Sequence, residues 1–224
     1  MICGLVKPSG GTYELLGRKF ESVKDEKEIR QVRAKVGCLI NYPAVYEGLS
    51  AYRNLEIVDR YFIDSHSGFY SDFNSNSKER EAQLNALLEM VGLKDAGKEH
   101  VRNLSPGMKE RLGIAQALLR DPDFLVLDEP YDHLDEQEIV EIREMLLKIN
   151  REKEVTILFS SHNLNPMAVM ATRFIFMDKG KIKKEISFED LTAECEEKKI
   201  DFENWFTQTY AAWRNQDETN EKYH

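Results

Sequence analysis

The sequence predicts an α/β fold in which a helical subdomain is inserted into a core of strands and helices. Short apolar strands alternate with amphipathic helices, and this alternation is typical of a sheet covered by helices. The helices expected between about residues 50 and 115 interrupt the alternation. The chain has 224 residues, of which 42% are hydrophobic, and this is enough to form a sizeable core.

Turn residues and apolar runs define the elements expected in the first half of the chain. The cluster Lys7-Pro8-Ser9-Gly10-Gly11 is a strong turn signal, so the apolar residues Met1 to Val6 are expected to be the end of a helix. The other expected elements are strands at 12–16 and 36–40, a helix at 50–62, a loop at 64–77 and helices at 78–91 and 112–119.

The second half shows the alternation most clearly. A helix with an apolar stripe is expected between two short apolar strands, and Lys179-Gly180 joins two further strands into a hairpin. Pro166 suits the first turn of a short helix. The expected elements are strands at 124–127 and 155–159, helices at 135–152 and 166–171, hairpin strands at 174–177 and 182–186, and a polar, frayed tail after residue 216.

The charge balance excludes some partners. The chain has 31 basic and 40 acidic residues, so its formal net charge is −9. Such a chain is a poor candidate for binding nucleic acid and is repelled by anionic lipids. No apolar run reaches the roughly 18 residues that span a bilayer, and no signal peptide is expected. Membrane attachment is therefore expected through a protein partner, without lipid insertion.

Cys3, Cys38 and Cys195 are too far apart for a metal site and are expected to be reduced thiols.

Two carboxylates follow a buried strand at residues 124–127. Asp128 and Glu129 stand at its C-terminal end, where open α/β sheets bind ligands, and Pro130 ends the strand. Asp128 can hold Mg²⁺ through water, while Glu129 can orient and deprotonate a water that attacks a phosphoryl group. Two solvated acids at a strand end are the alternative interpretation of this motif taken alone.

The surrounding motifs favour the chemical interpretation. Asp132-His133-Leu134-Asp135 follows within one turn, and His162 follows the next strand. Upstream, Ser105 is a candidate N-cap with Pro106 in the first helical position, so Ser105 and the exposed amides can bind an anion. Ordinary capping and a loop histidine are the alternatives for Ser105 and His162, but the order and spacing of all these motifs favour a joint function.

This assembly resembles the ATP-binding cassette (ABC) ATPases, and most of all the cassettes of bacitracin- and lantibiotic-type exporters. Residues 124–129 resemble the Walker B strand with its catalytic glutamate, 104–108 the signature motif, 132–135 the D-loop, and 36–55 the region of the Q-loop. The resemblance implies a P-loop NTPase-like (RecA-like) sheet core, with ATP and Mg²⁺ as cofactors. It implies catalytic roles for Glu129 and His162, Mg²⁺ binding through water by Asp128, and nucleotide contacts by Asp128, Ser105, Gly107, Asn41 and Asp135.

The family pattern is incomplete, because no P-loop of the form G-x-x-x-x-G-K-[ST] lies in the required context. We expect the fold to lack its first strands and Walker A, since the chain begins just beyond where that motif should lie. The segment Gly92 to Glu99 has similar spacing, but it follows a helical stretch and ends in an acid. Pro106 and Met108 replace the usual Gly and Gln, and Asn41 is one methylene shorter than the Q-loop glutamine.

The resemblance also implies a division of the chain and a function. Residues 1–50 and 116–195 form the ATPase core, 51–115 the helical signature subdomain, and 196–224 a C-terminal helix and polar tail. The expected function is the ATP-hydrolysing subunit of a bacterial exporter, on the cytoplasmic face of the membrane, paired with a second cassette and a transmembrane permease. The chain as given is expected to be inactive or very weak alone.

Two other functions are alternatives to this one. A degenerate or truncated cassette that only docks on a permease or partner cassette stays open as the alternative, although Asp128, Glu129 and His162 are all in place. A soluble ABC machine acting on ribosomes or DNA is disfavoured. The sequence contains neither a second cassette nor a long coiled-coil insertion, and it is acidic.

Overall fold

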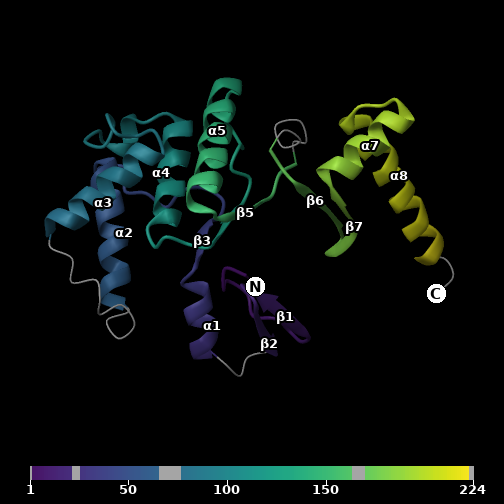
Figure 1. Cartoon of the computed structure of the whole chain (residues 1–224), viewed down its shortest axis with the longest axis horizontal. Helices are drawn as coiled ribbons and strands as arrows, with labels where there is room; N and C mark the ends of the chain where they lie inside the picture. The colour runs from purple at the N-terminus through teal and green to yellow at the C-terminus, as the bar shows by residue number, and fades with distance from the viewer. Residues whose placement is uncertain (1, 22–25, 66–76, 163–169, 222–224) are drawn as a thin grey trace. The chain divides into compact units, whose positions relative to one another are not determined.

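The computed structural model of the chain describes residues 2–21, 26–65, 77–162 and 170–221 (Figure 1). It divides into two compact units, Met1–Ser160 and Ser161–His224, each of which is described by itself. This division does not test the boundaries predicted at residues 50, 115 and 195, which stay predictions.

The first unit contains most of the elements that the sequence predicts and three that it does not. In chain order they are β1 (Thr12–Leu15), β2 (Arg18–Glu21), α1 (Glu26–Arg33), β3 (Val36–Leu39), α2 (Ala51–Ser65), α3 (Ser77–Met90), the 3₁₀ helix η1 (Val101–Asn103), α4 (Pro106–Leu118), β4 (Phe124–Leu127), α5 (Glu136–Lys153) and β5 (Thr156–Phe159). The predicted strands at 36–40, 124–127 and 155–159 are confirmed as β3, β4 and β5.

A parallel sheet in the order β3-β4-β5 is the centre of the first unit. Val36 pairs with Phe124 and Phe124 with Thr156, so the three C-terminal ends lie at one edge. Leu125 and Leu127 in the middle strand are almost fully buried. Because parallel strands end together, every residue that directly follows β3, β4 or β5 is placed at the same edge.

Helix α4 approaches β3 closely, and two glycines permit this approach. A methyl group on Gly37 would lie 2.3 Å from the backbone oxygen of Ala117, and one on Gly113 would lie 2.8 Å from the ring of Pro43. Atoms cannot come so near, so any larger side chain at either position would push α4 away from the sheet. These contacts fix the second half of α4 relative to β3 and the loop that follows it.

Helices α2, α3 and α4 pack on one another and lie side by side in Figure 1. Leu55, Leu88 and Leu112, one from each helix, are fully or almost fully buried between them. The buried Asp59 of α2 pairs with Arg80 of α3 through both oxygens. A buried carboxylate is tolerated where such a pair compensates its lost hydration.

The beginning of the chain differs from the prediction. Residues 2–6 form turns and bends where the end of a helix was expected, and Gly4 has a φ of +81°, outside the helical region. Six residues can form too few helical hydrogen bonds for a helix to be stable alone. The strand predicted at 12–16 is confirmed as β1, and it forms an antiparallel hairpin with β2, which was not predicted. Leu16 and Gly17 make the turn with φ angles of +49° and +73°.

The segment that imitates a P-loop is a turn, as predicted. Residues 91–99 follow α3 without a strand before them, and the N–H of Leu93 donates to the carbonyl of Leu88 at 2.7 Å. Leu93 is fully buried, so the segment serves the packing of the helices. The loop predicted at 64–77 lies largely outside the described residues.

The second unit is a small hairpin and helix assembly. Its elements are β6 (Arg173–Asp178), β7 (Lys181–Ser187), α7 (Phe188–Lys198) and α8 (Phe202–Glu221). The strands β6 and β7 pair antiparallel, which confirms the predicted hairpin. Aromatic side chains of β6 and α8 surround the fully buried Trp205. Its indole N–H donates to Glu194 at 2.8 Å, so its one polar atom is satisfied. The predicted helix at 166–171 lies mostly outside the described residues.

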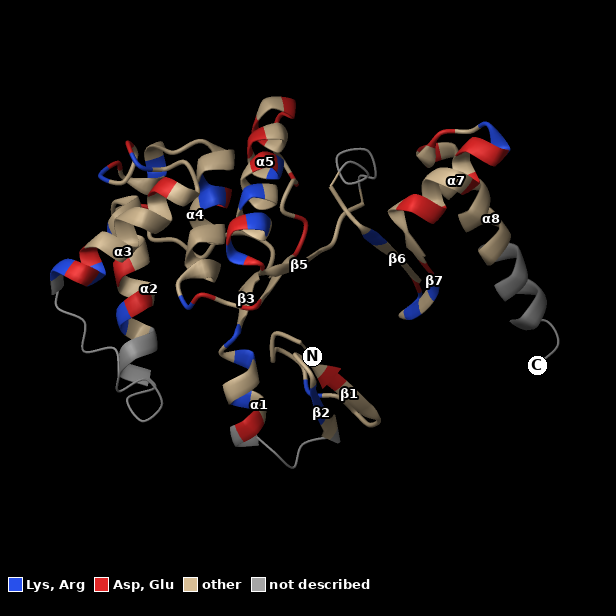
Figure 2. Cartoon of the chain, in the orientation of Figure 1, with Lys and Arg blue, Asp and Glu red and all other residues tan. Residues whose placement is uncertain are grey.

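Charged residues of both signs are interleaved along the helices (Figure 2). Along α5, for example, Glu141 and Glu144 flank Arg143, and every described α-helix that carries basic residues also carries acidic ones. None of the described helices combines the length and the hydropathy needed to cross a membrane.

Candidate functional site

The edge at which β3, β4 and β5 end brings together the polar residues that follow them. Asp128 and Glu129 follow β4 directly, Ser160 follows β5 directly, and Asn41 comes two residues after β3. Asp128 continues the sheet pattern, because its N–H donates to the carbonyl of Leu39 at 2.9 Å. The carboxylates predicted from the sequence therefore stand at the carboxyl edge of a parallel sheet.

The Ser160 hydroxyl links the two acidic residues. It donates to Oδ1 of Asp128 at 2.6 Å and accepts the backbone N–H of Glu129 at 3.0 Å. The Ser160 N–H in turn donates to the carbonyl of Leu127 at 3.0 Å. Ser160 is not among the site residues predicted from the sequence. Its position directly after an apolar strand is the signal that points to it.

The backbone turns sharply at Glu129. This residue has a φ of +51°, the left-handed region, and its carbonyl accepts the N–H of Asp132 at 3.0 Å. A residue other than glycine in this region carries a backbone strain of about 1–3 kcal/mol, which is found most often where a site needs it. The buried Pro130 follows and fixes the turn.

Two loops meet beside this turn. The ring of Tyr42 stacks on His133 with a centroid distance of 5.9 Å and an interplanar angle of 9°. The imidazole Nε2 of His133 lies 3.0 Å from a carboxylate oxygen of Asp132. Asn41, directly before Tyr42, is exposed and has a φ of +57°. The Q-loop and D-loop segments predicted from the sequence are thus in contact.

The N-terminus of α4 has the predicted cap. Ser105 accepts the N–H of Met108 through its hydroxyl at 3.2 Å, and Pro106 occupies the first helical position. The next residue, Gly107, is buried, and its N–H donates to Oε1 of Glu138 at 3.0 Å. Glu138 lies on α5, whose N-cap is Asp135; the Asp135 carboxylate accepts the Glu138 N–H at 2.8 Å.

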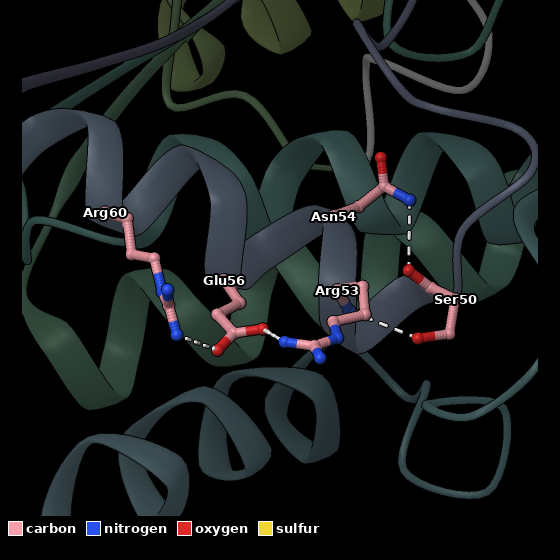
Figure 3. Close-up of polar contacts among 5 residues, drawn as sticks. All are labelled: Ser50, Arg53, Asn54, Glu56 and Arg60. Atoms are coloured by element: carbon pink, nitrogen blue, oxygen red, sulfur yellow. Dashed lines mark hydrogen bonds and ion pairs between the residues drawn. The ribbon is translucent and has the colours of Figure 1, made fainter. Parts of the chain in front are cut away.

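A buried amide holds the loop before α2, and Figure 3 shows its hydrogen bond to Ser50. Asn54 is fully buried and its side chain makes three hydrogen bonds: it accepts the Tyr46 N–H at 2.7 Å and donates to the carbonyls of Tyr46 and Ser50 at 3.1 and 3.0 Å. On the exposed side of the same helix, hydrogen bonds from Arg53 and Arg60 lower the pKa of Glu56. Asn54 therefore fixes the loop that joins Asn41 and Tyr42 to the helices.

His162 lies in the second unit and is exposed. Because the units are described separately, the predicted contact of His162 with the phosphate near Glu129 stays a prediction. The first unit brings together Asp128, Glu129 and Ser160, and separately Ser105, Gly107 and Asp135 through Glu138.

Two buried groups of the first unit have raised pKa values. Burial raises the pKa of Tyr131, next to the site, to about 12, so its hydroxyl stays protonated at neutral pH. Burial also raises the pKa of Glu110 on α4 to about 7.

No group of three or more metal-ligating side chains occurs among the residues that the structure describes.

Known proteins resemble this chain in sequence and in fold. The family model described as "ABC transporter" matches residues 1–132. The chain is 35% identical over 191 residues to the uncharacterized ABC transporter ATP-binding protein YcbN of Bacillus subtilis (strain 168), covering 85% of this chain and 56% of that protein. It is 34% identical to the bacitracin transport ATP-binding protein BcrA of Bacillus licheniformis, again over 85% of this chain and 56% of that protein. The chain thus spans little more than half the length of these curated relatives.

Solved cassettes share the fold. The structure of cbiO1 from Clostridium perfringens, part of the ABC transporter complex cbiONQ, matches with a TM-score of 0.72 and 22% identity, over 87% of this chain and 73% of that one. The ATP-binding cassette MJ0796 in a post-hydrolysis state with ADP and Pi matches with a TM-score of 0.68 and 24% identity, over 84% and 77%. The predicted P-loop NTPase-like fold class is confirmed. Because the family model covers more than half of the chain and the fold agrees with it, this protein belongs to the ABC transporter family.

Proposed function

We propose that this chain is the ATP-hydrolysing subunit of a bacterial ABC exporter, of the peptide-antibiotic or multidrug type. The observation that carries the proposal is the arrangement at the end of β4, where Ser160 links Asp128 to the backbone of Glu129. Two solvated acids at a strand end would not need such a fixed partner. The name of the B. licheniformis relative, a bacitracin transport ATP-binding protein, supports the transport class.

The carboxylate of Asp128 fits Mg²⁺. Mg²⁺ prefers hard oxygen ligands and is commonly held by one or two carboxylates together with waters and phosphate oxygens. Asp128 supplies such a carboxylate, and one of its oxygens is oriented by the Ser160 hydroxyl at 2.6 Å. When bound, Mg²⁺ neutralises charge on the phosphates that are being transferred.

Each site residue has a proposed role in this reaction. Asp128 holds the metal through water, and Glu129 orients the attacking water and accepts its proton. His162 contacts the γ-phosphate, and Asn41 takes the place of the Q-loop glutamine. Ser105 and Gly107 contact the phosphate held by a second cassette, because a capped helix N-terminus favours anions. Asp135 contributes at the interface between the two cassettes.

The proposed partners are a second cassette, identical or different, and a transmembrane permease. Asn54 supports the permease coupling, since it anchors the loop after Asn41 to helix α2 by three hydrogen bonds. The proposed location is the cytoplasmic face of the cell membrane, reached through the permease. The acidic net charge of −9 supports attachment by protein contacts instead of anionic lipid.

We expect the 224-residue chain alone to bind MgATP weakly. A P-loop supplies several backbone N–H groups and a lysine to the phosphates, and no segment of this sequence supplies them in that context. Isothermal titration calorimetry with MgATP up to millimolar concentration measures this. A micromolar dissociation constant would falsify the expectation and imply a different phosphate site.

Glu129→Gln tests the chemical role of the carboxylate. The variant is made in a chimaera in which the P-loop segment of the B. licheniformis relative precedes residue 1. Glutamine keeps the shape and removes the base, so phosphate release should slow by about 10²–10⁴-fold. ATP binding should survive, and an ATP-bound dimer should accumulate in size-exclusion chromatography.

The matched control is Glu136→Gln, which makes the same change at an exposed position of α5. It should hydrolyse ATP like its parent chimaera. If Glu129→Gln also hydrolyses ATP at the parental rate, the two carboxylates are only a solvated strand end and the proposed function is wrong.

A further inference from the structure

The backbone N–H of Gly107 already has an anionic partner within the chain. Oε1 of Glu138 accepts this N–H at 3.0 Å. The two residues are in close contact, since a methyl group on Gly107 would lie 2.7 Å from Cδ of Glu138. Gly107 is buried, and the Glu138 carboxylate covers it. The first N–H of α4, that of Gly107, therefore faces a carboxylate and not solvent.

Glu138 is held in this place by its own helix. It is the third residue of α5, and its N–H donates to the N-cap Asp135 at 2.8 Å. A glutamate at this position commonly turns back to the N–H of its own cap residue. Here the Glu138 side chain reaches across to α4 instead. Glu138 therefore connects the signature segment, through its side chain, to the D-loop segment, through its N–H.

A second carboxylate of α5 contacts α4 without touching the Gly107 N–H. Glu141, one turn after Glu138, lies 3.4 Å from a guanidinium nitrogen of Arg111. Arg111 Nε also donates to the Gly107 carbonyl at 3.4 Å. Two carboxylates thus join the same pair of helices, but only Glu138 occupies the N–H end of α4. This difference provides a matched control.

A phosphate and the Glu138 carboxylate cannot share this N–H. Both are anions that would accept the same hydrogen, and at a separation of about 4 Å like charges repel by roughly 1–4 kcal/mol near a protein surface. A helix N-terminus attracts either of them by the same dipole and the same unpaired amides. Whichever anion is bound therefore excludes the other.

We propose that Glu138 is an internal competitor for phosphate at the signature motif, which keeps the Gly107 N–H closed until the carboxylate moves aside. The proposal rests on the proposed function, in which Gly107 contacts the phosphate of a nucleotide held by a second cassette. Asp135 caps the helix turn that carries Glu138. A partner that contacts the D-loop would therefore move the Glu138 carboxylate. Glu138 thereby makes nucleotide contact at the signature depend on cassette pairing.

The test follows the Gly107 amide in the full chain. The ¹⁵N-labelled protein is titrated with inorganic phosphate at constant ionic strength, and the ¹H–¹⁵N signal of Gly107 is recorded in the parent, Glu138→Ala, Glu138→Gln and Glu141→Gln. Glu138→Ala should bind phosphate at least about tenfold more tightly than the parent, as expected when a like charge close by is removed. Glu138→Gln retains an oxygen that can accept the hydrogen bond but loses the charge, so it should show an intermediate gain.

Glu141→Gln breaks the other contact between the same helices and should behave like the parent. Amide hydrogen exchange adds a readout without ligand: Gly107 should exchange faster in Glu138→Ala only. Equal phosphate responses in all four proteins, or no response in any, would overturn the proposal.

Failure of this inference can be told apart from failure of the proposed function. If the Glu138 variants respond like the parent while the Glu129→Gln chimaera still forms an ATP-bound dimer, only the role of Glu138 is wrong. If that dimer is also absent, the function assigned to the signature segment is wrong as well.

Discussion

Glu110 is an acidic side chain on the face of α4 that is turned away from solvent. Its Oε1 is buried and has no hydrogen-bond partner among the described residues, and burial raises its pKa to about 7 from the ordinary value of 4.5. Between pH 4.5 and about pH 7, Glu110 therefore keeps its proton in the folded chain and loses it in the unfolded chain. Stability should fall as pH rises from about 4.5 to about 7, and the full penalty is present above pH 7.

Glu110→Gln should remove this pH-dependent penalty. Glutamine has nearly the same shape but no charge, so the variant should gain on the order of 2–3 kcal/mol at pH 8 and little at pH 5. Urea unfolding at both pH values measures the gain. Glu144→Gln, at an exposed position of α5, is the control and should change stability by a similar small amount at each pH. An equal gain for Glu110→Gln at pH 5 and pH 8 would contradict the assignment.

At the scale of an element, the loop before α2 depends on one amide. Asn54→Ala removes three part-buried hydrogen bonds and leaves the Tyr46 N–H without this acceptor, while the Tyr46 carbonyl keeps only the N–H of Leu49 at 3.1 Å among the described contacts. A loss of about 2–3 kcal/mol is expected, because buried polar groups that lose their partner are costly. Limited proteolysis should also cut the loop at 42–50 faster than in the parent.

The neighbouring residue of the same helix turn provides the control for this loss. Arg53 pairs with Glu56 at the exposed surface, so Arg53→Ala should leave both stability and proteolysis nearly unchanged. If the two variants lose the same stability, Asn54 does not hold the loop.

Elements with strong local signals were predictable from the sequence, and those shaped by distant contacts were not. The four apolar residues of β4 and the turn residues around it give that strand unambiguously. Helix α4 begins at Pro106, six residues before the predicted start, although Ser105 and Pro106 were recognised as its cap. Strand β2 was missed because Arg18 to Glu21 alternate only weakly and the turn before them places a leucine at positive φ.

The site residues that lie beside a strand end or a helix start were predictable from the sequence, and those that act through distant contacts were not. Asp128, Glu129, Ser105 and Asp135 stand out by their spacing, since each lies next to a strand end or a helix start. Ser160 and Glu138 act through partners more than thirty residues away in sequence. No periodicity encodes such contacts, because they arise only when the strands pair and the helices pack.

At the scale of the whole molecule, the two units should unfold separately. Both tryptophans of the chain, Trp205 and Trp213, lie in the second unit, and most of the helices lie in the first. Tryptophan fluorescence therefore reports the second unit, while far-UV circular dichroism reports mainly the first. We expect two different midpoints in urea, because each unit has its own core. Superimposable transitions with one midpoint would show that the units unfold together.

The order of strands in the central sheet has a consequence for how the chain folds. Strand β3 pairs in parallel with β4, whose residues are about ninety positions later in the sequence. During synthesis β3 must therefore wait for helices α2, α3 and α4 to be made before its partner exists. At about 5–20 residues per second this delay lasts several seconds, during which its apolar residues lack their native partner. Pairings of such long sequence separation also fold slowly, so a chaperone that binds short apolar segments should associate with the nascent chain before residue 124 has emerged.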